Sequence, residues 1–231
     1  MPAEPRSVLI IPALNEEQAI GRTLDAVPWE LYRQVLVADN GSRDRTAEIA
    51  VAHGATVVSE PQRGYGAACL RALAAVKSGA EAVVFMDADS SDDPQEAFLL
   101  LAPILEGRAE LVLGSRTLGK VEKGSVLPHQ AFGNRLATAL IRLIYGYRFS
   151  DLGPFRAVRT DCLMRLGMRD RNYGWTAEMQ IKAVRQGLRI VEIPVTYRKR
   201  IGKSKISGRP WASVRAGFKI VWTVLRLAMS A

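Results

Sequence analysis

Two carboxylates separated by one residue stand directly after an apolar run of the sequence. Asp87 and Asp89 follow residues 82–86 (AVVFM), a pattern typical of a buried strand. Side chains spaced in this way at a strand end can both reach a hard divalent cation and the diphosphate that the cation neutralises. The alternative is a solvated turn, since residues 90–94 continue as SSDDP. The spacing alone favours neither interpretation, but the strand context favours a metal site.

Other polar groups follow apolar runs in the same way. Asp39 lies in residues 38–42 (ADNGS), where its carboxylate can accept from the N–H edge of uracil or guanine. It also fits an Asx turn that leads into a helix, and both can hold. Residues 12–16 (PALNE) contain no glycine-rich turn, which argues against a nicotinamide-type dinucleotide fold. Residues 64–69 (GYGAAC) form a partial glycine motif, which helix packing explains more often than phosphate contact.

An alternation of strands and helices must position these residues. We expect strands at residues 8–14, 34–40, 56–60, 82–87 and 110–116, and helices at 16–26, 43–53 and 66–77. This order predicts parallel crossovers and a doubly wound α/β sheet. Because such sheets bind ligands at the carboxyl ends of their strands, the polar residues at these ends are expected to meet at one edge.

The second half is dominated by amphipathic helices. Residues 132–147 and 211–229 each carry an apolar stripe beside basic residues, which is the pattern of a helix that lies in a membrane surface. The commoner alternative is that both stripes pack on the sheet. In the last helix, apolar residues also cover the other side, so it can pack inward and still face lipid. We also expect a helix at 175–186, a strand at 188–197 and a basic loop at 198–209.

The chain has 231 residues and a formal net charge of +9 that is unevenly distributed. Residues 1–96 carry 15 acidic and 8 basic side chains, whereas residues 193–231 carry 9 basic side chains and no acidic one. A basic protein favours nucleic acid as a partner, but an acidic cluster at the ligand edge repels phosphate unless a metal intervenes. We therefore expect no nucleic-acid partner, and expect the excess of basic residues after residue 96 to meet an acceptor and a membrane surface.

The expected cellular compartment follows from motifs that the sequence lacks. Cys69 and Cys162 have no C-x-x-C spacing, so neither a zinc site nor a disulfide scaffold is expected, and lone thiols fit a reducing cytoplasm. The first ten residues show no signal peptide. The longest apolar runs, such as 97–105, fall short of the ~18–20 residues that span a bilayer.

Taken together, these motifs resemble a known family. Residues 12–17 (PALNEE), 37–46 (VADNGSRDRT), 63–68 (RGYGAA) and 87–89 (DAD) are similar in order and spacing to the family 2 glycosyltransferases of the GT-A fold. The later segments 114–116 (GSR), 151–157 (DLGPFRA), 175–187 and 192–208 resemble the dolichyl-phosphate mannosyltransferases and bacterial polyprenyl-phosphate glycosyltransferases. The resemblance covers residues 7 to about 209.

The resemblance implies a GT-A fold, an α/β architecture with a mostly parallel, twisted, Rossmann-like sheet flanked by helices. A domain at 1–209 would hold a nucleotide-sugar and metal half (1–116) and an acceptor half (117–209), followed by the amphipathic helix 210–231. The implied activity is metal-dependent, inverting transfer of mannose or glucose from a nucleotide sugar of the GDP-mannose or UDP-glucose type to a polyprenyl or dolichyl phosphate. The protein would then be peripheral at the cytoplasmic face of the membrane. Alternatives are a non-lipid acceptor or a non-catalytic nucleotide-binding module.

The resemblance also implies roles for individual residues. Those expected to hold the nucleotide sugar are Pro12, Leu14, Asn15, Glu16, Asp39, Asn40, Gly41, Arg63, Gly64, Gly66, Asp87, Ala88 and Asp89, with Mg or Mn on Asp87 and Asp89. Those expected to meet the acceptor phosphate are Arg116, Arg135, Arg200, Lys203 and Lys205. The implied catalytic set is Asp89, Arg116, Arg200, Lys205 and Glu178, of which Glu178 matches an acidic position near the acceptor and is expected to be secondary.

Three positions depart from the family pattern. Asn40 stands where a second Asp is common, and Ser91 stands where mannosyl relatives often carry Gln near the metal. These two leave the donor base and sugar open. Residues 153–154 (GP) replace the usual Ser-Gly in the acceptor half.

Overall fold

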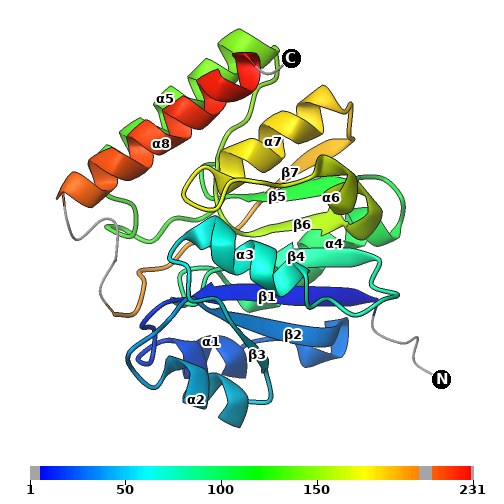
Figure 1. Ribbon diagram of the computed structural model, residues 1–231. Coiled ribbons are helices and arrows are strands. Elements are labelled where there is room, and N and C mark those ends of the chain that lie inside the picture. The colour runs from blue at the N-terminus through cyan, green and yellow to red at the C-terminus, as the bar shows by residue number, and fades with distance from the viewer. Residues whose placement is uncertain (1–5, 203–209, 230–231) are drawn as a thin grey trace.

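The computed structural model describes residues 6–202 and 210–229, and within them a seven-stranded sheet forms the centre of the molecule (Figure 1). The strands lie in the order β3-β2-β1-β4-β6-β5-β7. Their bounds are β1 Ser7–Ala13, β2 Tyr32–Asp39, β3 Thr56–Ser59, β4 Ala82–Phe85, β5 Leu111–Ser115, β6 Arg156–Arg159 and β7 Ile190–Pro194. The six strands expected from the sequence are all present.

The sheet is parallel except at one strand. β1 pairs in parallel with β2 and β4, and β7 pairs in parallel with β5, but β6 runs antiparallel to both β4 and β5. β6 was not expected, because its four residues (RAVR) place an arginine at either end of two apolar residues. The predicted fold class, a mostly parallel α/β sheet flanked by helices, is confirmed.

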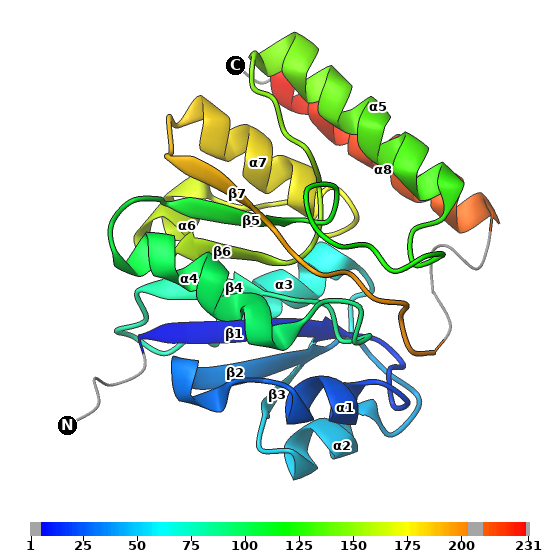
Figure 2. The ribbon, with the colours of Figure 1, turned by 180° about the vertical axis from the view of Figure 1, so that it is seen from behind.

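Helices cover both faces of the sheet (Figures 1 and 2). One face carries α3 (Tyr65–Leu73), α6 (Thr160–Leu166) and α7 (Trp175–Arg185), and the other carries α1 (Ile20–Asp25), α2 (Thr46–Ala52) and α4 (Ala97–Leu105). Short 3₁₀ helices lie at Trp29–Leu31 and Pro94–Glu96. Alternate residues of each central strand enter the two cores, as β1 shows by placing Val8 and Ile10 on one side and Leu9 and Ile11 on the other.

Two long helices, α5 (Pro128–Tyr145) and α8 (Pro210–Met229), lie side by side beyond α7 (Figures 1 and 2). They contact each other and α7, and Ile141, Val224 and Leu227 enter the core beneath them. The Tyr145 hydroxyl donates to the carbonyl oxygen of Val224 at 2.6 Å. Within the part of the chain that the structure describes, no helix has both the length and the apolar character needed to cross a membrane.

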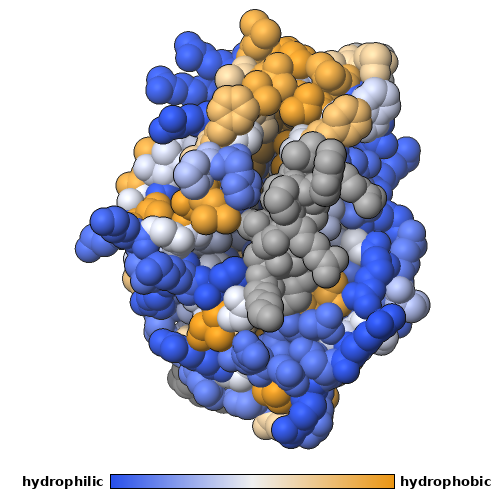
Figure 3. All heavy atoms as spheres, turned by 90° about the vertical axis from the view of Figure 1, so that its left-hand side faces the viewer, coloured by the Kyte–Doolittle hydropathy of each residue, from blue (hydrophilic) through white to orange (hydrophobic). Residues whose placement is uncertain are grey.

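The apolar stripe predicted for residues 132–147 packs inward only in part, since Leu140, Ile144 and Tyr147 pack against the core. Ala137 and Ile141 are buried, whereas Phe132, Leu136 and Leu143 are exposed, Leu143 to 81%. On α8 the inner side is buried, and Phe218, Trp222, Leu225 and Met229 are exposed. Figure 3 shows apolar atoms gathering over these two helices. Both helices are therefore apolar on the side that packs and on the side that faces out.

The carboxyl ends of β1, β2 and β4 lie together at one edge of the sheet. Ala13, the last residue of β1, pairs with Asp39, the last residue of β2. Ile10 of β1 pairs with Phe85, the last residue of β4. The first helix begins at Ile20 rather than at residue 16, because residues 15–17 are used in hydrogen bonds to the loop that follows β2. The expected meeting of polar strand ends is thus observed.

Candidate functional site

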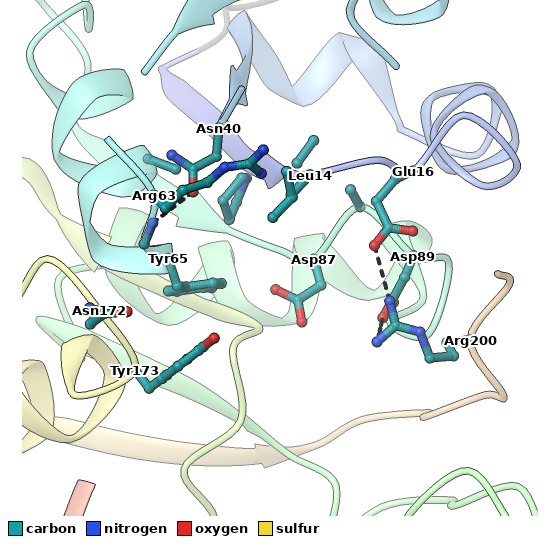
Figure 4. Close-up of a pocket in the computed structure, with 15 residues that line it drawn as sticks. Leu14, Glu16, Asn40, Arg63, Tyr65, Asp87, Asp89, Asn172, Tyr173 and Arg200 are labelled. Carbon is teal, nitrogen blue, oxygen red and sulfur yellow. Dashed lines mark hydrogen bonds and ion pairs between the residues drawn. The ribbon is translucent and has the colours of Figure 1, made fainter. Parts of the chain in front are cut away.

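A pocket of about 450 Å³ opens at this edge of the sheet. Its wall is built from the ends of β1, β2 and β4, the start of α3, the loop before α7 and the segment after β7. In Figure 4 the Asp87 carboxylate points into the centre, with Tyr65 and Tyr173 on one side and Glu16, Asp89 and Arg200 on the other. The lining therefore combines three carboxylates with two guanidinium groups, those of Arg63 and Arg200.

The two carboxylates that follow β4 both line the pocket, but they are held differently. Asp89 is buried, and its Oδ1 accepts from the backbone N–H of Ser91 at 3.0 Å and from the Ser91 hydroxyl at 2.5 Å. Ser91, one of the positions noted in the sequence, thus orients Asp89. The Asp87 carboxylate has no hydrogen-bond or ion-pair partner among the described residues. Behind it lies buried Asp92, whose Oδ2 accepts from the backbone N–H of Asp87 at 3.3 Å.

Burial, followed by the charge of Asp89, raises the pKa of Asp87 to about 7, although Arg200 and Arg116 act to lower it. Burial and the same two carboxylates raise the pKa of Asp92 well above its ordinary value. The Asp92 Oδ1 atom is buried without a partner in the described part of the chain. Crowded carboxylate oxygens with too few donors are the hard ligands that Mg²⁺ and Mn²⁺ take.

The residues present therefore fit a divalent cation on Asp87 and Asp89. No group of three His, Cys, Asp or Glu side chains in residues 6–202 and 210–229 is placed to hold a metal by itself. The remaining ligands of a cation on Asp87 and Asp89 would then come from a diphosphate and from water, as is usual for Mg²⁺ bound with a nucleotide.

Hydrogen bonds join the loops that follow β1 and β2. Asn15 has φ +50°, its N–H donates to the Ser42 hydroxyl at 2.9 Å, and its Oδ1 accepts from the N–H of Arg43 at 2.8 Å. The N–H of Glu16 donates to the Thr46 hydroxyl at 2.8 Å. Pro12, Leu14 and Glu16 line the pocket, whereas Asn15 serves as the link between the loops.

Asp39 and Asn40 both act on neighbouring backbone. Both Asp39 carboxylate oxygens accept from the N–H of Ser42, at 3.2 and 3.3 Å, which is the Asx turn considered from the sequence. Asp39 and Gly41 do not belong to the pocket lining, but Asn40 does. The Asn40 amide donates to the carbonyls of Glu60 and Gln62 and accepts from the N–H of Gly64. It thereby fixes the loop that carries Arg63.

The glycines at the start of α3 allow a close approach of two backbones. A Cβ on Gly64 would collide with the carbonyl oxygen of Arg171, and one on Gly66 with that of Asp170. The N–H groups of Gly66 and Ala67 donate to the carbonyls of residues 172 and 171. Helix packing, the commoner interpretation of this motif, is therefore what the structure shows at Gly66, while Gly64 also lines the pocket. The contact brings Asn172 and Tyr173 into the wall.

Arg200 spans two of the pocket carboxylates. Its Nη2 lies 3.0 Å from Glu16 Oε1, and its Nη1 lies 3.3 Å from Asp89 Oδ2. The N–H of Ile201 donates to the Asp89 carbonyl at 2.9 Å, and that of Arg198 to the Ser91 carbonyl at 2.8 Å. The segment after β7 is thus fastened across the Asp87–Asp89 loop.

Two of the predicted acceptor-side cations, Arg116 and Arg135, lie outside the pocket. Arg116 donates from its N–H, Nε and Nη2 to both oxygens of Asp151, at 2.7 to 2.9 Å, and its guanidinium lies 5.0 Å from the centre of the Tyr197 ring. Burial acts to lower its pKa, but Asp151 more than offsets this and the pKa is raised. Arg135 is exposed on α5. Neither Arg116 nor Arg135 lines the pocket, and Lys203 and Lys205 lie outside the described residues.

Glu178 supports the pocket wall and does not line it. Its carboxylate is 1% exposed and accepts from the backbone N–H groups of Arg169 and Asp170, while Lys182 Nζ lies 2.7 Å from Oε1. These contacts hold residues 169–173, which end in the two lining residues Asn172 and Tyr173.

Of the residues predicted from the sequence, the pocket collects ten. These are Pro12, Leu14, Glu16, Asn40, Arg63, Gly64, Asp87, Ala88, Asp89 and Arg200. It also contains Ala13, Tyr65, Ala68, Asn172 and Tyr173, which were not predicted. Tyr65 and Ala68 lie inside the glycine motif, and only the polar, aromatic composition of residues 170–174 (DRNYG) before α7 marked the other loop.

Comparison with known proteins decides the family. Residues 8–167 match Glycosyl transferase family 2. The chain belongs to this family. An uncharacterized glycosyltransferase of Mycobacterium tuberculosis is 37% identical over 210 residues, which are 90% of this chain and 93% of that protein. The undecaprenyl-phosphate mannosyltransferase of Micrococcus luteus is 31% identical over 222 residues, 88% of each chain.

Among solved structures, glucosyl-3-phosphoglycerate synthase from Mycobacterium tuberculosis has the same fold. In its complex with Mn²⁺, uridine-diphosphate-glucose and phosphoglyceric acid, it superposes with a TM-score of 0.77 at 26% identity, over 96% of this chain and 79% of that one. The expected family 2 membership and GT-A fold are confirmed. The relatives differ in acceptor, one named for a lipid phosphate and the other bound to a small phosphorylated acid.

Proposed function

We propose that this family 2 glycosyltransferase moves mannose or glucose from a nucleotide sugar to a polyprenyl or dolichyl phosphate at the cytoplasmic face of a membrane. The donor diphosphate would lie in the pocket, and Asp87 and Asp89 would hold Mg²⁺ or Mn²⁺. The Mn²⁺ and UDP-glucose in the structural neighbour support this assignment of donor and metal. The metal would stabilise the charge that develops on the departing diphosphate.

The observation that carries the lipid acceptor is the outward apolar face of α5 and α8. We call the exposed side chains of this face the α5/α8 face: Phe132, Leu136, Leu143, Phe218, Trp222, Leu225 and Met229. Seven large apolar side chains on two adjacent helices exceed the scattered exposure that is normal for a soluble surface.

The charges around the α5/α8 face suit an anionic lipid surface. Neither residues 128–145 nor residues 210–229 contain an acidic residue. Arg135 and Arg142 are exposed on α5, and Arg226 is half-exposed on α8. Cations near anionic headgroups contribute roughly 1 kcal/mol each. An apolar face beside cations and without carboxylates is what an in-plane membrane helix needs.

A lipid phosphate is also an acceptor that this pocket can use. The second pKa of a phosphate monoester is about 6, so the acceptor is largely a dianion at neutral pH and needs little general-base help. Its oxygen attacks the anomeric carbon, the bond from that carbon to the diphosphate oxygen breaks, and the electron pair leaves with the nucleoside diphosphate. The chain must then mainly position the two substrates, which agrees with a Glu178 carboxylate that is committed to backbone N–H groups.

A small phosphorylated acceptor is the second candidate. It is favoured by the phosphoglyceric acid in the structural neighbour. Such an acceptor supplies the same ionised phosphate chemistry but does not account for the α5/α8 face.

Transfer from radiolabelled donors tests the two candidates together. The full chain is incubated with Mn²⁺ and with GDP-mannose or UDP-glucose, and with a short-chain polyprenyl phosphate in detergent or with 3-phosphoglycerate. We expect label in the organic phase from one donor with the lipid acceptor. Label that stays in the aqueous phase as a sugar-phosphoglycerate product would favour the second candidate.

Liposome flotation tests the membrane part. Removing α8 would also remove Val224 and Leu227 from the core, so point variants are preferable. Phe218→Ser with Leu143→Ser should lower the fraction bound to vesicles that contain anionic lipid. Val51→Ser, which changes another well-exposed apolar side chain, on α2, should not. Equal flotation of the two variants would contradict the proposed orientation.

A further inference from the structure

Arg200 forms an ion pair with a carboxylate oxygen of Asp89 that a metal ion would need as a ligand. Asp89 Oδ1 is already engaged by the N–H and hydroxyl of Ser91, and Oδ2 is the oxygen that faces Arg200 Nη1 at 3.3 Å. A divalent cation bound to that oxygen lies about 2.0–2.6 Å from it. The guanidinium and the cation would then be neighbours of the same charge, and they would repel each other.

Arg200 contacts a second carboxylate, that of Glu16, which makes its position specific. Arg200 Nη2 donates to Glu16 Oε1 at 3.0 Å. One guanidinium therefore joins the loop after β1 to the loop after β4 across the pocket (Figure 4). Both carboxylates are buried, whereas the arginine side chain is 31% exposed. The group that can move is therefore the arginine.

We propose that Arg200 competes with the metal for Asp89, and that the nucleotide diphosphate relieves this competition by taking the displaced guanidinium. Metal and nucleotide then bind cooperatively, each weakly alone and tightly together, because the diphosphate supplies the anion that Arg200 loses. The inference rests on the proposed function, since it takes Asp87 and Asp89 as the metal ligands.

The surrounding backbone allows this exchange. Ile201 stays attached to the Asp89 carbonyl through its N–H, so the segment remains beside the pocket when the side chain turns. Arg200 Nε is buried and has no hydrogen-bond partner among the described residues, which leaves a third N–H for a ligand oxygen. A guanidinium offers donors in a planar fork that matches phosphate oxygens.

Binding of MnCl₂ alone, followed by electron paramagnetic resonance of free Mn²⁺, tests the proposal. Arg200→Gln should bind Mn²⁺ about two- to fivefold more tightly than the wild type, the range expected when one partly exposed ion pair no longer competes. Arg200→Lys should lie between them, because lysine keeps the charge but cannot span both carboxylates. Arg198→Gln is the matched control, since Arg198 lies on the same segment but pairs with Asp93.

Titration of UDP and GDP at saturating Mn²⁺ completes the test. Arg200→Gln should bind the preferred nucleotide about tenfold more weakly than the wild type, so that one substitution changes the two affinities in opposite directions. Mn²⁺ binding by Arg200→Gln that is equal to or weaker than that of the wild type overturns the competition. If the wild type still binds nucleotide in a Mn²⁺-dependent way in the same samples, the proposed function survives; if it binds none, the proposed function fails as well.

Discussion

The Glu178→Gln variant distinguishes a wall-supporting carboxylate from a catalytic one. Glutamine keeps the shape of the side chain but removes its charge and one of its two acceptor oxygens. The backbone N–H groups of Arg169 and Asp170 donate to Glu178 Oε2 at 3.1 and 2.6 Å, and in the variant they would share the single amide oxygen. Lys182 would keep only its bond to the carbonyl of Gly167.

The size of the stability loss in Glu178→Gln follows from the burial of the ion pair. Removing one partner of a buried ion pair costs roughly 3–5 kcal/mol, but Lys182 is 17% exposed and the amide oxygen still accepts one bond. We expect the free energy of unfolding to fall by about 2–4 kcal/mol. Urea unfolding of the wild type, Glu178→Gln, Lys182→Met and the double variant measures it, and the double variant should lose less than the sum of the single losses.

Activity gives the second half of the test. At a temperature where Glu178→Gln is folded, we expect it to retain at least about a tenth of the wild-type transfer rate. Asp89→Asn should lose about a hundred- to a thousandfold, as is typical when transition-state charge is no longer stabilised. The reasoning is refuted if Glu178→Gln unfolds like the wild type and loses as much activity as Asp89→Asn.

Three further predictions concern stability. Because the pKa of Asp87 is raised to about 7 by burial and by a neighbouring carboxylate, the folded state binds more protons than the unfolded state between pH 4 and 7. The charge of Asp87 then lowers stability as pH rises through this window. Without metal, Asp87→Asn should raise Tm by roughly 3–6 °C at pH 8 and leave it unchanged at pH 4. An unchanged Tm at pH 8 would show that the charge of Asp87 does not destabilise the fold. Gly66→Ala should destabilise the fold by about 2 kcal/mol or more in urea, because its Cβ meets a backbone carbonyl. Gly133→Ala, with open space around its Cβ, should stabilise by about 0.5–1 kcal/mol, and a similar sign for both would be inconsistent with the packing. Arg116→Lys should cost about 1–3 kcal/mol by the same measurement, since lysine cannot bind Asp151 through two nitrogens; a neutral result would show that the pair is not structural.

The pocket floor could be predicted from the sequence because it depends on local rules. Apolar runs that end in Pro12, Asp39 and Asp87 are strands of a parallel sheet, and parallel strands bring their carboxyl ends to one edge. The structure confirms that edge, with Ala13 opposite Asp39. The order of strands and helices was therefore enough to bring the acidic residues together.

The remaining parts depend on contacts between distant segments. Nothing in the local sequence shows that Asp151 neutralises Arg116, or that residues 170–172 pack against Gly64 and Gly66. The sequence predicted an amphipathic α5 but could not show which of its apolar residues pack inward, because they lie on more than one side of the helix. Tertiary packing decided in favour of Ala137 and Ile141.

Calorimetric titration of UDP and GDP into the wild type, with Mn²⁺ and separately with EDTA, tests the central claim most directly. Asp89→Asn serves as the matched variant. We predict that one nucleotide binds in Mn²⁺, and that its affinity falls at least tenfold in EDTA and in Asp89→Asn. Equal binding with and without the metal, or no binding of either nucleotide, would contradict a nucleotide-sugar site at Asp87 and Asp89.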